Sequence, residues 1–150
     1  MAIHVVMKQS SNVDSIEVEI RYNELNDEVR KLEHSIRAFD SYLIGDSDER
    51  QFKIRIGDIY YFESVDKKTF IYTKNEVFRT KSSLYEIYSK VNQRDFIRVS
   101  RSCIVNIDVL DYVKNIANSR LEATLINGEK IMISRTYLKD IRNAFLGGVE

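Results

Sequence analysis

Proline is absent from the sequence, and glycine occurs only five times in 150 residues. Long flexible linkers are therefore not expected, because such linkers are built from glycine, serine and proline. The sequence also has no apolar run of about 18 residues, and its N-terminus has no basic region followed by an apolar core. We therefore expect neither a membrane span nor a signal peptide. A hydrophobic content of 43% is instead sufficient for a globular core.

Cysteine occurs once, as Cys103, so a disulfide within the chain is excluded. A single thiol fits a reducing compartment, and we expect a cytoplasmic location. Cys103 begins the apolar run Cys103–Val105, which favours a buried and unreactive thiol.

Features typical of catalysis are scarce. The two histidines, His4 and His34, have no cysteine, histidine or carboxylate neighbours at the spacing of metal ligands. No glycine-rich phosphate loop is present, and no sequence motif supports a Ser–His or Cys–His pair. We therefore predict no enzymatic activity, no metal site and no cofactor.

The zero net charge of the chain conceals two halves of opposite sign. Residues 1–49 contain 5 Lys/Arg and 11 Asp/Glu, a net charge of −6, whereas residues 50–150 contain 18 Lys/Arg and 12 Asp/Glu, a net charge of +6. Such an asymmetry suggests two regions with different partners. The basic half suits a polyanion, and the acidic half suits a protein surface. The polar stretch Gly45–Arg50, where the sign changes, is the predicted boundary.

Residues 1–45 predict a short strand followed by a helix. Apolar and charged residues alternate over Ile16–Tyr22, as in a half-buried strand, and Asn23 is a candidate helix cap. An apolar stripe at spacings of three and four residues then predicts a helix that ends near Gly45. The stripe consists of Leu25, Val29, Leu32, Ile36, Phe39 and Leu43.

Two interpretations of this stripe remain open. It packs on its own domain, or it pairs with a second copy of the chain. The stripe is too short for a free coiled coil, but long enough to help a sheet hold two chains together. We expect residues 1–45 to form an acidic arm that makes a homodimer contact.

Residues 50–150 are dominated by short β patterns, with turns near Asp66–Lys68 and Lys74–Glu76. The predicted strands are Phe52–Ile56, Ile59–Glu63, Phe70–Thr73 and Val77–Thr80. Ser83 and Glu86 have the spacing of a capping box, so a small helix should start there. Its predicted apolar face consists of Leu84, Ile87, Tyr88 and Val91.

The C-terminal part predicts a hairpin and a last helix. Asn127–Gly128 between two β patterns is a signal for a type I′ hairpin turn. Leu138, Ile141 and Phe145 lie on one helix face, and Gly147–Gly148 should stop that helix. The predicted fold is mainly β with small helices, preceded by the short β/α arm.

The stretch Phe96–Asn106, with sequence FIRVSRSCIVN, sets two arginines and two serines in an otherwise apolar run. Buried arginines are costly unless they are paired. Arg98 and Arg101 should therefore lie where a strand turns onto an exposed edge. There they can contact phosphates and base edges, or they are simply solvated surface residues.

This stretch resembles the central signature of the LytTR DNA-binding domain of bacterial response regulators. Three further blocks resemble that family in the same order, over residues 50–147. They are Asp58–Ser64, Ser82–Leu84, and the pair Leu125–Glu129 and Ile133–Leu138. The resemblance implies small antiparallel sheets whose loops, and not a recognition helix, enter the major groove of DNA.

The resemblance also implies which residues contact DNA. Lys68 and Thr69, next to Lys67, match a first contacting loop. Ser100, Arg101 and Ser102, next to Arg98, match a second loop, and Arg135 and Thr136 match a third. Asn106, at the end of the central signature, is expected to make structural hydrogen bonds. Thr136 departs from the pattern, because a longer basic or amide side chain often stands there, so Arg135 is expected to carry that contact alone or weakly.

We therefore expect a stand-alone regulator that binds double-stranded DNA in a sequence-specific way, as a homodimer on paired short promoter sites. A receiver domain and a phosphorylation switch are not expected within this chain. The resemblance also implies a partner, because some stand-alone LytTR regulators are thought to be controlled by a small membrane protein. Two alternatives remain open: a protein-interaction or dimerisation module whose basic loops are incidental, and single-stranded RNA binding through exposed aromatic residues. The candidate aromatic residues are Tyr60, Phe62, Phe70 and Tyr72.

Overall fold

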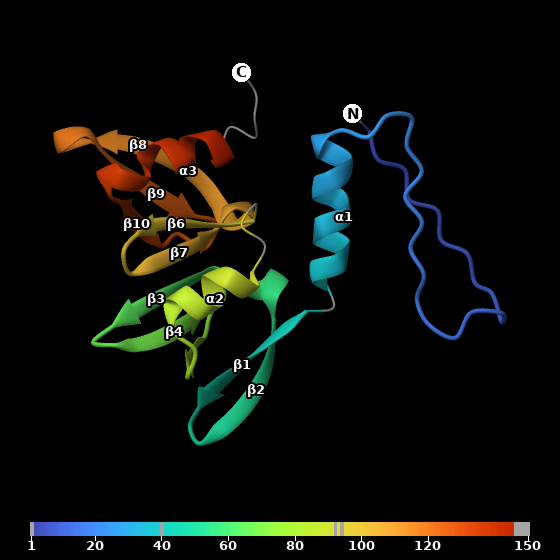
Figure 1. The fold of residues 1–150 in the computed structure, drawn as a ribbon, viewed down its shortest axis with the longest axis horizontal. Coiled ribbons are helices and arrows are strands. Elements are labelled where there is room, and N and C mark those ends of the chain that lie inside the picture. The colour runs from blue at the N-terminus through green and yellow to red at the C-terminus, as the bar shows by residue number, and fades with distance from the viewer. Residues whose placement is uncertain (1, 40, 92, 94, 146–150) are drawn as a thin grey trace.

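The computed structural model describes residues 2–39, 41–91, 93 and 95–145. In that part of the chain, two antiparallel sheets are accompanied by three α-helices (Figure 1). The helices are α1 (Asp27–Phe39), α2 (Leu84–Lys90) and α3 (Leu138–Phe145). The predicted fold class, mainly β with small helices, is confirmed. None of the helices described is long and apolar enough to cross a membrane.

The larger sheet has the strand order β2-β1-β5-β4-β3-β7-β6, and the smaller sheet has the order β10-β9-β8. The strands of the larger sheet are β1 (Tyr42–Ser47), β2 (Arg50–Arg55), β3 (Tyr61–Val65), β4 (Lys68–Tyr72), β5 (Val77–Thr80), β6 (Phe96–Ser100) and β7 (Cys103–Asn106). Those of the smaller sheet are β8 (Leu110–Ile116), β9 (Arg120–Leu125) and β10 (Lys130–Ile133). Short 3₁₀ turns are η1 (Ile56–Asp58), η2 (Ile107–Val109), η3 (Ala117–Ser119) and η4 (Arg135–Tyr137).

A row of apolar side chains crosses four strands of the larger sheet. Phe62 is paired with Ile104 on one side and with Ile71 on the other, and Ile71 is paired with Phe78. Phe62, Ile71 and Ile104 are fully buried. Because side chains alternate along a strand, this register brings one apolar face together. Leu84 and Ile87 of α2 belong to the same buried cluster.

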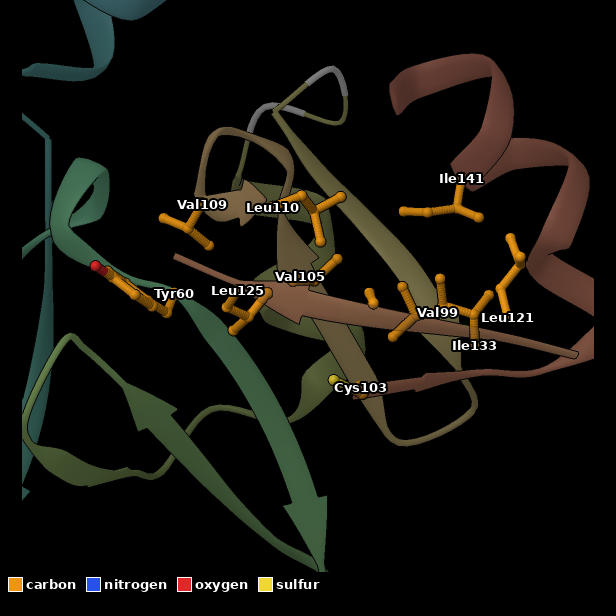
Figure 2. Close-up of a cluster of buried hydrophobic side chains, with 11 residues drawn as sticks. Tyr60, Val99, Cys103, Val105, Val109, Leu110, Leu121, Leu125, Ile133 and Ile141 are labelled. Atoms are coloured by element: carbon orange, nitrogen blue, oxygen red, sulfur yellow. The ribbon is translucent and has the colours of Figure 1, made fainter. Parts of the chain in front are cut away.

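The second core lies between the two sheets and is closed by α3. Figure 2 shows Ile141 of α3 close to Val99 of β6 and to Ile133 and Leu121 of the smaller sheet. Ile141, Val99 and Ile133 have no exposed surface. Leu138 and Phe145 pack against this cluster, as their spacing predicted, whereas the predicted stop at Gly147–Gly148 lies outside the described residues.

Helix α2 begins at the predicted capping box. The Glu86 backbone N–H donates to Ser83 Oγ at 3.1 Å, and the Ser83 N–H donates to Glu86 Oε1 at 3.3 Å. These two bonds satisfy N–H groups that a helix start otherwise leaves without partners.

Of the elements predicted in the first 45 residues, the helix is present but shorter than expected, and the strand is absent from the described chain. Ile16–Tyr22 is extended but is not a strand, because no other strand in the described chain pairs with it. The helix begins at Asp27 and not after Asn23, since Asn26 Oδ1 accepts a hydrogen bond from the Val29 N–H at 3.0 Å. It ends at Phe39, and Leu43 belongs to β1, where it packs on the core of its own chain.

The polar stretch at residues 45–50 is a hairpin turn and not a linker. Asp48 and Glu49 have φ angles of 50° and 65° and join β1 to β2 in a two-residue turn, the pattern of type I′. Gly45 lies within β1, where a Cβ atom would come 2.7 Å from Phe78 Cβ. Residues 42–47 are therefore part of the sheet, and the division into an arm and a DNA-binding domain remains a prediction.

The turn at Asn127–Gly128, by contrast, is not of the predicted type I′. Gly128 has a φ of 91°, but Asn127 does not have a positive φ. The Gly128 N–H donates to the Leu125 carbonyl at 2.9 Å, and the Leu125 N–H donates to the Glu129 carbonyl at 2.8 Å. This pattern is that of a longer hairpin loop with a bulged glycine, which the same dipeptide also suits.

Candidate nucleic-acid interface

The predicted contact loops lie side by side at one edge of the molecule. Figure 1 shows the turns β3–β4, β6–β7 and β8–β9 and the segment between β10 and α3 on the same side. Two backbone hydrogen bonds fix this arrangement: Ser64 N–H donates to the Ser102 carbonyl, and Ser134 N–H donates to the Val99 carbonyl, both at 2.8 Å. Segments far apart in sequence are thus joined at this edge.

We call Lys67, Lys68, Arg101 and Arg135 the basic edge. All four side chains are exposed. The ion pairs of the described residues, Asp27–Arg30, Glu33–Arg37 and Glu122–Lys130, involve none of them. Cations without a carboxylate partner are available to bind the phosphates of a nucleic acid.

The first loop is a tight turn formed by Asp66 and Lys67, whose φ angles are 52° and 65°. Val65 and Lys68 face each other across it, so both lysines project where the hairpin ends. Thr69, by contrast, is only 5% exposed. Its predicted DNA contact therefore depends on the cleft beside the hairpin, whose lining it shares with Lys67 and Lys68.

In the second loop, the two arginines of the central signature have different contacts. Arg98 Nη1 donates to the Arg101 carbonyl at 3.0 Å, and its guanidinium lies 5.4 Å from the centre of the Tyr88 ring. Arg98 therefore holds the turn, while the Arg101 side chain has no hydrogen-bond partner among the described residues. Ser100 and Ser102 flank it, and Ser102 N–H donates to Ser100 Oγ at 3.3 Å.

In the third loop, Arg135 Nε donates to the Asn118 carbonyl at 3.2 Å. Asn118 is in the left-handed region, with a φ of 64°, so the β8–β9 turn presents its carbonyl to this arginine. Thr136 beside it is exposed. The remaining N–H groups of the Arg135 guanidinium stay available for a ligand.

Asn106 has the structural role that the sequence predicted. Its Nδ2 donates to the Ile59 carbonyl at 2.9 Å, and its Oδ1 accepts from the Asp108 N–H at 3.0 Å. The side chain is buried, and it links the end of β7 to the start of β3.

Two further cations, Arg79 and Lys81, were missed by the sequence analysis. They line a cleft of about 590 Å³ together with Lys67, Lys68 and the hydroxyl residues Ser82 and Ser83. Asp46 and Glu86 also line it, so the cleft is mixed in charge. The alternation in β5, where Phe78 is buried and Arg79 exposed, was the available signal.

A pair of stacked tyrosines lies on the larger sheet, and one of them, Tyr61, bonds to the β9–β10 turn of the smaller sheet. The rings of Tyr61 and Tyr72 lie 4.2 Å apart at an interplanar angle of 10°. Tyr61 Oη donates to Glu129 Oε2 at 2.7 Å, and Tyr72 Oη donates to Glu63 Oε1 at 3.1 Å. Burial and the bond to Glu129 raise the pKa of Tyr61, and burial and the bond to Glu63 raise the pKa of Tyr72 to about 12.

The described residues contain no group of three or more histidine, cysteine or carboxylate side chains arranged for a metal ion. Cys103 is buried, and burial raises the pKa of its thiol to about 12. A thiol in this state is a poor nucleophile.

Known proteins resemble the chain over this same region. A family model described as the LytTr DNA-binding domain matches residues 49–146. A solved structure described as the LytTr DNA-binding domain of a methyl-accepting/DNA response regulator from Bacillus cereus superposes with a TM-score of 0.66. It is 25% identical, and the match covers 70% of this chain and 96% of the other.

Two relatives differ in how much they share with the chain. The sensory transduction protein LytT of Bacillus anthracis is 34% identical over 89 residues, which are 59% of this chain but 36% of LytT. This chain thus spans about a third of LytT. A protein of Staphylococcus aureus strain bovine RF122, named an uncharacterized HTH-type transcriptional regulator, is 29% identical over 127 residues, 83% of this chain and 86% of the relative. That alignment is too long to lie within residues 49–150, so it includes part of the preceding segment.

The family match covers well over half of the chain, and it includes the basic edge and every described strand except β1. The solved structure has the same fold. The chain therefore belongs to the LytTr DNA-binding domain family.

Proposed function

We propose that this chain is a sequence-specific transcriptional regulator that binds double-stranded DNA as a homodimer. The observation that carries the proposal is the basic edge, where three turns from distant parts of the sequence meet. They expose four cations that have no carboxylate partner in the described part of the chain. A family of DNA-binding domains and a relative named as a transcriptional regulator support the same function.

The residues of the basic edge have different expected roles. The Arg101 guanidinium, in the central turn, has no partner among the described residues, so we assign it to a base edge, where arginine pairs best with guanine. Lys67 and Lys68 lie at the end of a flanking hairpin and are assigned to phosphates. Arg135 is partly held by Asn118 and, with Thr136, provides a third contact. Ser100 and Ser102 are short donors beside Arg101.

The RNA-binding alternative loses support from the burial of its aromatic residues. Tyr60 is 7% exposed and Phe62 is fully buried, so neither offers a face on which a base can stack. Phe70 and Tyr72 are half-buried, and Tyr72 is already stacked on Tyr61.

The dimer part of the proposal rests on α1. No residue of this helix is buried, and Phe39 remains 62% exposed although it belongs to the predicted apolar stripe. Val29, Leu32 and Ile36 are half-buried, and the Arg55 guanidinium lies 4.0 Å from the centre of the Phe39 ring. An amphipathic helix whose apolar face is only partly covered within the described chain suits a second copy. Five residues of the stripe fit this role: Leu25, Val29, Leu32, Ile36 and Phe39. Leu43 does not, because it packs on its own core.

The experiment for DNA binding selects bound sites from a pool of random duplexes and then measures affinity for the enriched site. We expect enrichment of a short motif that occurs in two copies at a fixed spacing. Absence of enrichment, together with equal affinity for all duplexes, would contradict sequence-specific binding.

The experiment for the dimer replaces Leu32 and Phe39 by glutamate and measures the molar mass by sedimentation. We expect a folded monomer that binds one half-site weakly but selectively. Lys31→Glu, an exposed position of the same helix, is the control and should remain dimeric. A monomeric wild-type chain at tens of micromolar would contradict the proposal.

A further inference from the structure

The first 26 residues of the chain include an extended arm without a partner. In the described part of the molecule, residues 2–26 contain no strand and join neither sheet. Figure 1 shows the arm on the outer side of α1, away from the sheets. Ile16 is 92% exposed and Val18 is 58% exposed. Apolar surface of this extent in contact with water is unfavourable, so the arm has the properties of a segment that binds elsewhere.

The larger sheet has one uncovered edge. Its two terminal strands are β2 and β6. The edge at β6 is covered, since Ser134 N–H donates to the Val99 carbonyl. Strand β2 pairs with β1 on one side, and none of the backbone hydrogen bonds described is made on its other side. An edge strand of this kind is a template for a further strand.

The arm and this edge match in length and in side-chain pattern. Strand β2 has six residues, with Phe52 and Ile54 toward the core and Lys53 and Arg55 on the opposite face. In the arm, apolar residues alternate with Glu17, Glu19 and Arg21 over Ile16–Tyr22. Placed beside β2, the arm extends the apolar face of the sheet and sets Glu17 and Glu19 among its basic side chains. Opposite charges in such cross-strand positions are stabilising.

The other open edge, strand β8, matches less well. Its pairing with β9 has an irregularity between Leu110 and Tyr112, and Asp111 there would meet the glutamates of the arm with the same charge.

The position of the arm favours binding to a second copy over binding to its own chain. In Figure 1 the arm lies on the far side of α1 from the sheets, and it joins no strand of its own chain in the described residues.

We propose that residues 16–22 of one chain add as a strand to the β2 edge of a second copy, and that the second copy returns the same contact. Two arms exchanged about a twofold axis bury both uncovered surfaces at once. The exchange uses none of the residues of the basic edge, so it does not depend on DNA binding.

The test is disulfide cross-linking between two full-length variants in a Cys103→Ala background. One chain carries Glu19→Cys and the other carries Lys53→Cys, and the two are mixed before mild oxidation. Residues paired across strands bring their Cβ atoms to within about 5 Å, close to the spacing that a disulfide needs. We expect a covalent heterodimer on a non-reducing gel. Lys114→Cys, an exposed lysine on β8, replaces Lys53→Cys as the matched control and should give none.

The double variant, with both cysteines in one chain, distinguishes exchange from folding back. Exchange predicts covalent dimers, whereas a cross-linked monomer would overturn the proposal. Equal cross-linking of Lys53→Cys and Lys114→Cys, or none of either, would overturn it as well.

Charge reversal provides a second readout by sedimentation. Glu19→Lys alone and Lys53→Glu alone should each raise the dimer dissociation constant about tenfold, because the contact occurs twice in a symmetric dimer. The two changes in one chain should restore the wild-type value. Additive weakening in the double variant would overturn the pairing. Binding of a single DNA half-site should be unchanged in all three, so failure of this inference and failure of the proposed function are distinguishable.

Discussion

Arg98 and Arg101 stand three residues apart, but their guanidinium groups have different partners. Arg98 is held by the Arg101 carbonyl and the Tyr88 ring, whereas the Arg101 side chain points to solvent without a described partner. A side chain that holds a turn affects stability first, and one that is free affects binding first. The two arginines at this edge therefore differ: Arg98 is held by its own chain, and Arg101 is free to bind a ligand.

Replacing Arg101 by alanine should impair specific binding more than non-specific binding. A good arginine–guanine contact discriminates against the wrong base by about 1–3 kcal/mol. Lys68→Ala should instead weaken all duplexes nearly equally, because a phosphate contact carries no sequence information. Competition between the selected site and a scrambled duplex measures the ratio. An unchanged ratio for a folded Arg101→Ala variant would show that this side chain does not read a base.

The thiol of Cys103 should be unreactive in the folded protein. Burial raises its pKa to about 12, so at neutral pH the thiolate is scarce, and the surrounding core excludes a reagent. Labelling with a chromogenic disulfide should be slow in buffer and fast in concentrated urea. Fast labelling of the folded chain would show that this core opens readily.

At the scale of elements, strand β1 depends on Gly45, which the sequence analysis interpreted only as part of a domain boundary. A Cβ atom at Gly45 would meet Ile54 Cδ1 and come 2.7 Å from Phe78 Cβ. Gly45→Ala should therefore destabilise the fold by about 1–3 kcal/mol through overpacking. Gly57→Ala is the control, since no atom lies within 4 Å of a Cβ there. Urea unfolding of the Gly45→Ala and Gly57→Ala variants measures this difference. Equal free energies of unfolding would mean that the β1–β2 hairpin moves to make room for the added methyl group.

The elements that sequence analysis located well are those with local signals. The capping box at Ser83 and Glu86 and the strand Val77–Thr80 were predicted at the residues where they occur. The arm was misjudged, because the alternation over Ile16–Tyr22 shows which side chains share a face but not whether another strand lies alongside. Leu43 fits the helical spacing equally well. Its place in β1 depends on pairing with Ile54, a contact that the spacing cannot report.

The same limit applies to the candidate interface. The turns that contain Lys67, Arg101 and Arg135 were located from the sequence. That they share one edge was predicted only by the family resemblance. Their proximity depends on the bonds from Ser64 to Ser102 and from Ser134 to Val99. Arg79 was missed because it reaches the cleft only through the pairing of β5 with β4.

On the scale of the whole molecule, Tyr61 of the stacked pair joins the larger sheet to the β9–β10 turn, and the pair makes the protein less stable at high pH. Tyr72 has a pKa of about 12 in the folded chain and an ordinary value near 10 when unfolded. The folded state thus keeps a proton that the unfolded state loses, and this stability is present below pH 10 and is lost between about pH 10 and 12.

The urea midpoint should therefore fall as the pH rises above 10, and it should fall less in the double variant Tyr61→Phe and Tyr72→Phe. Both phenylalanines keep the ring stack and remove the ionisable hydroxyls. If the urea midpoint fell equally with pH in the wild type and the double variant, other ionisable groups would be responsible for the loss of stability.

The central claim is that the basic edge binds duplex DNA, and a salt titration with matched charge variants tests it most directly. One variant replaces Lys67, Lys68, Arg101 and Arg135 by glutamine, and the other replaces the exposed Lys74, Lys90, Lys114 and Lys139. Both lose the same charge. We predict that only the first loses affinity for the selected duplex and that its slope of log affinity against log salt becomes shallower, by about 0.9 per lost phosphate contact. Equal losses in the two variants, or no duplex binding by the wild type at low salt, would contradict the account.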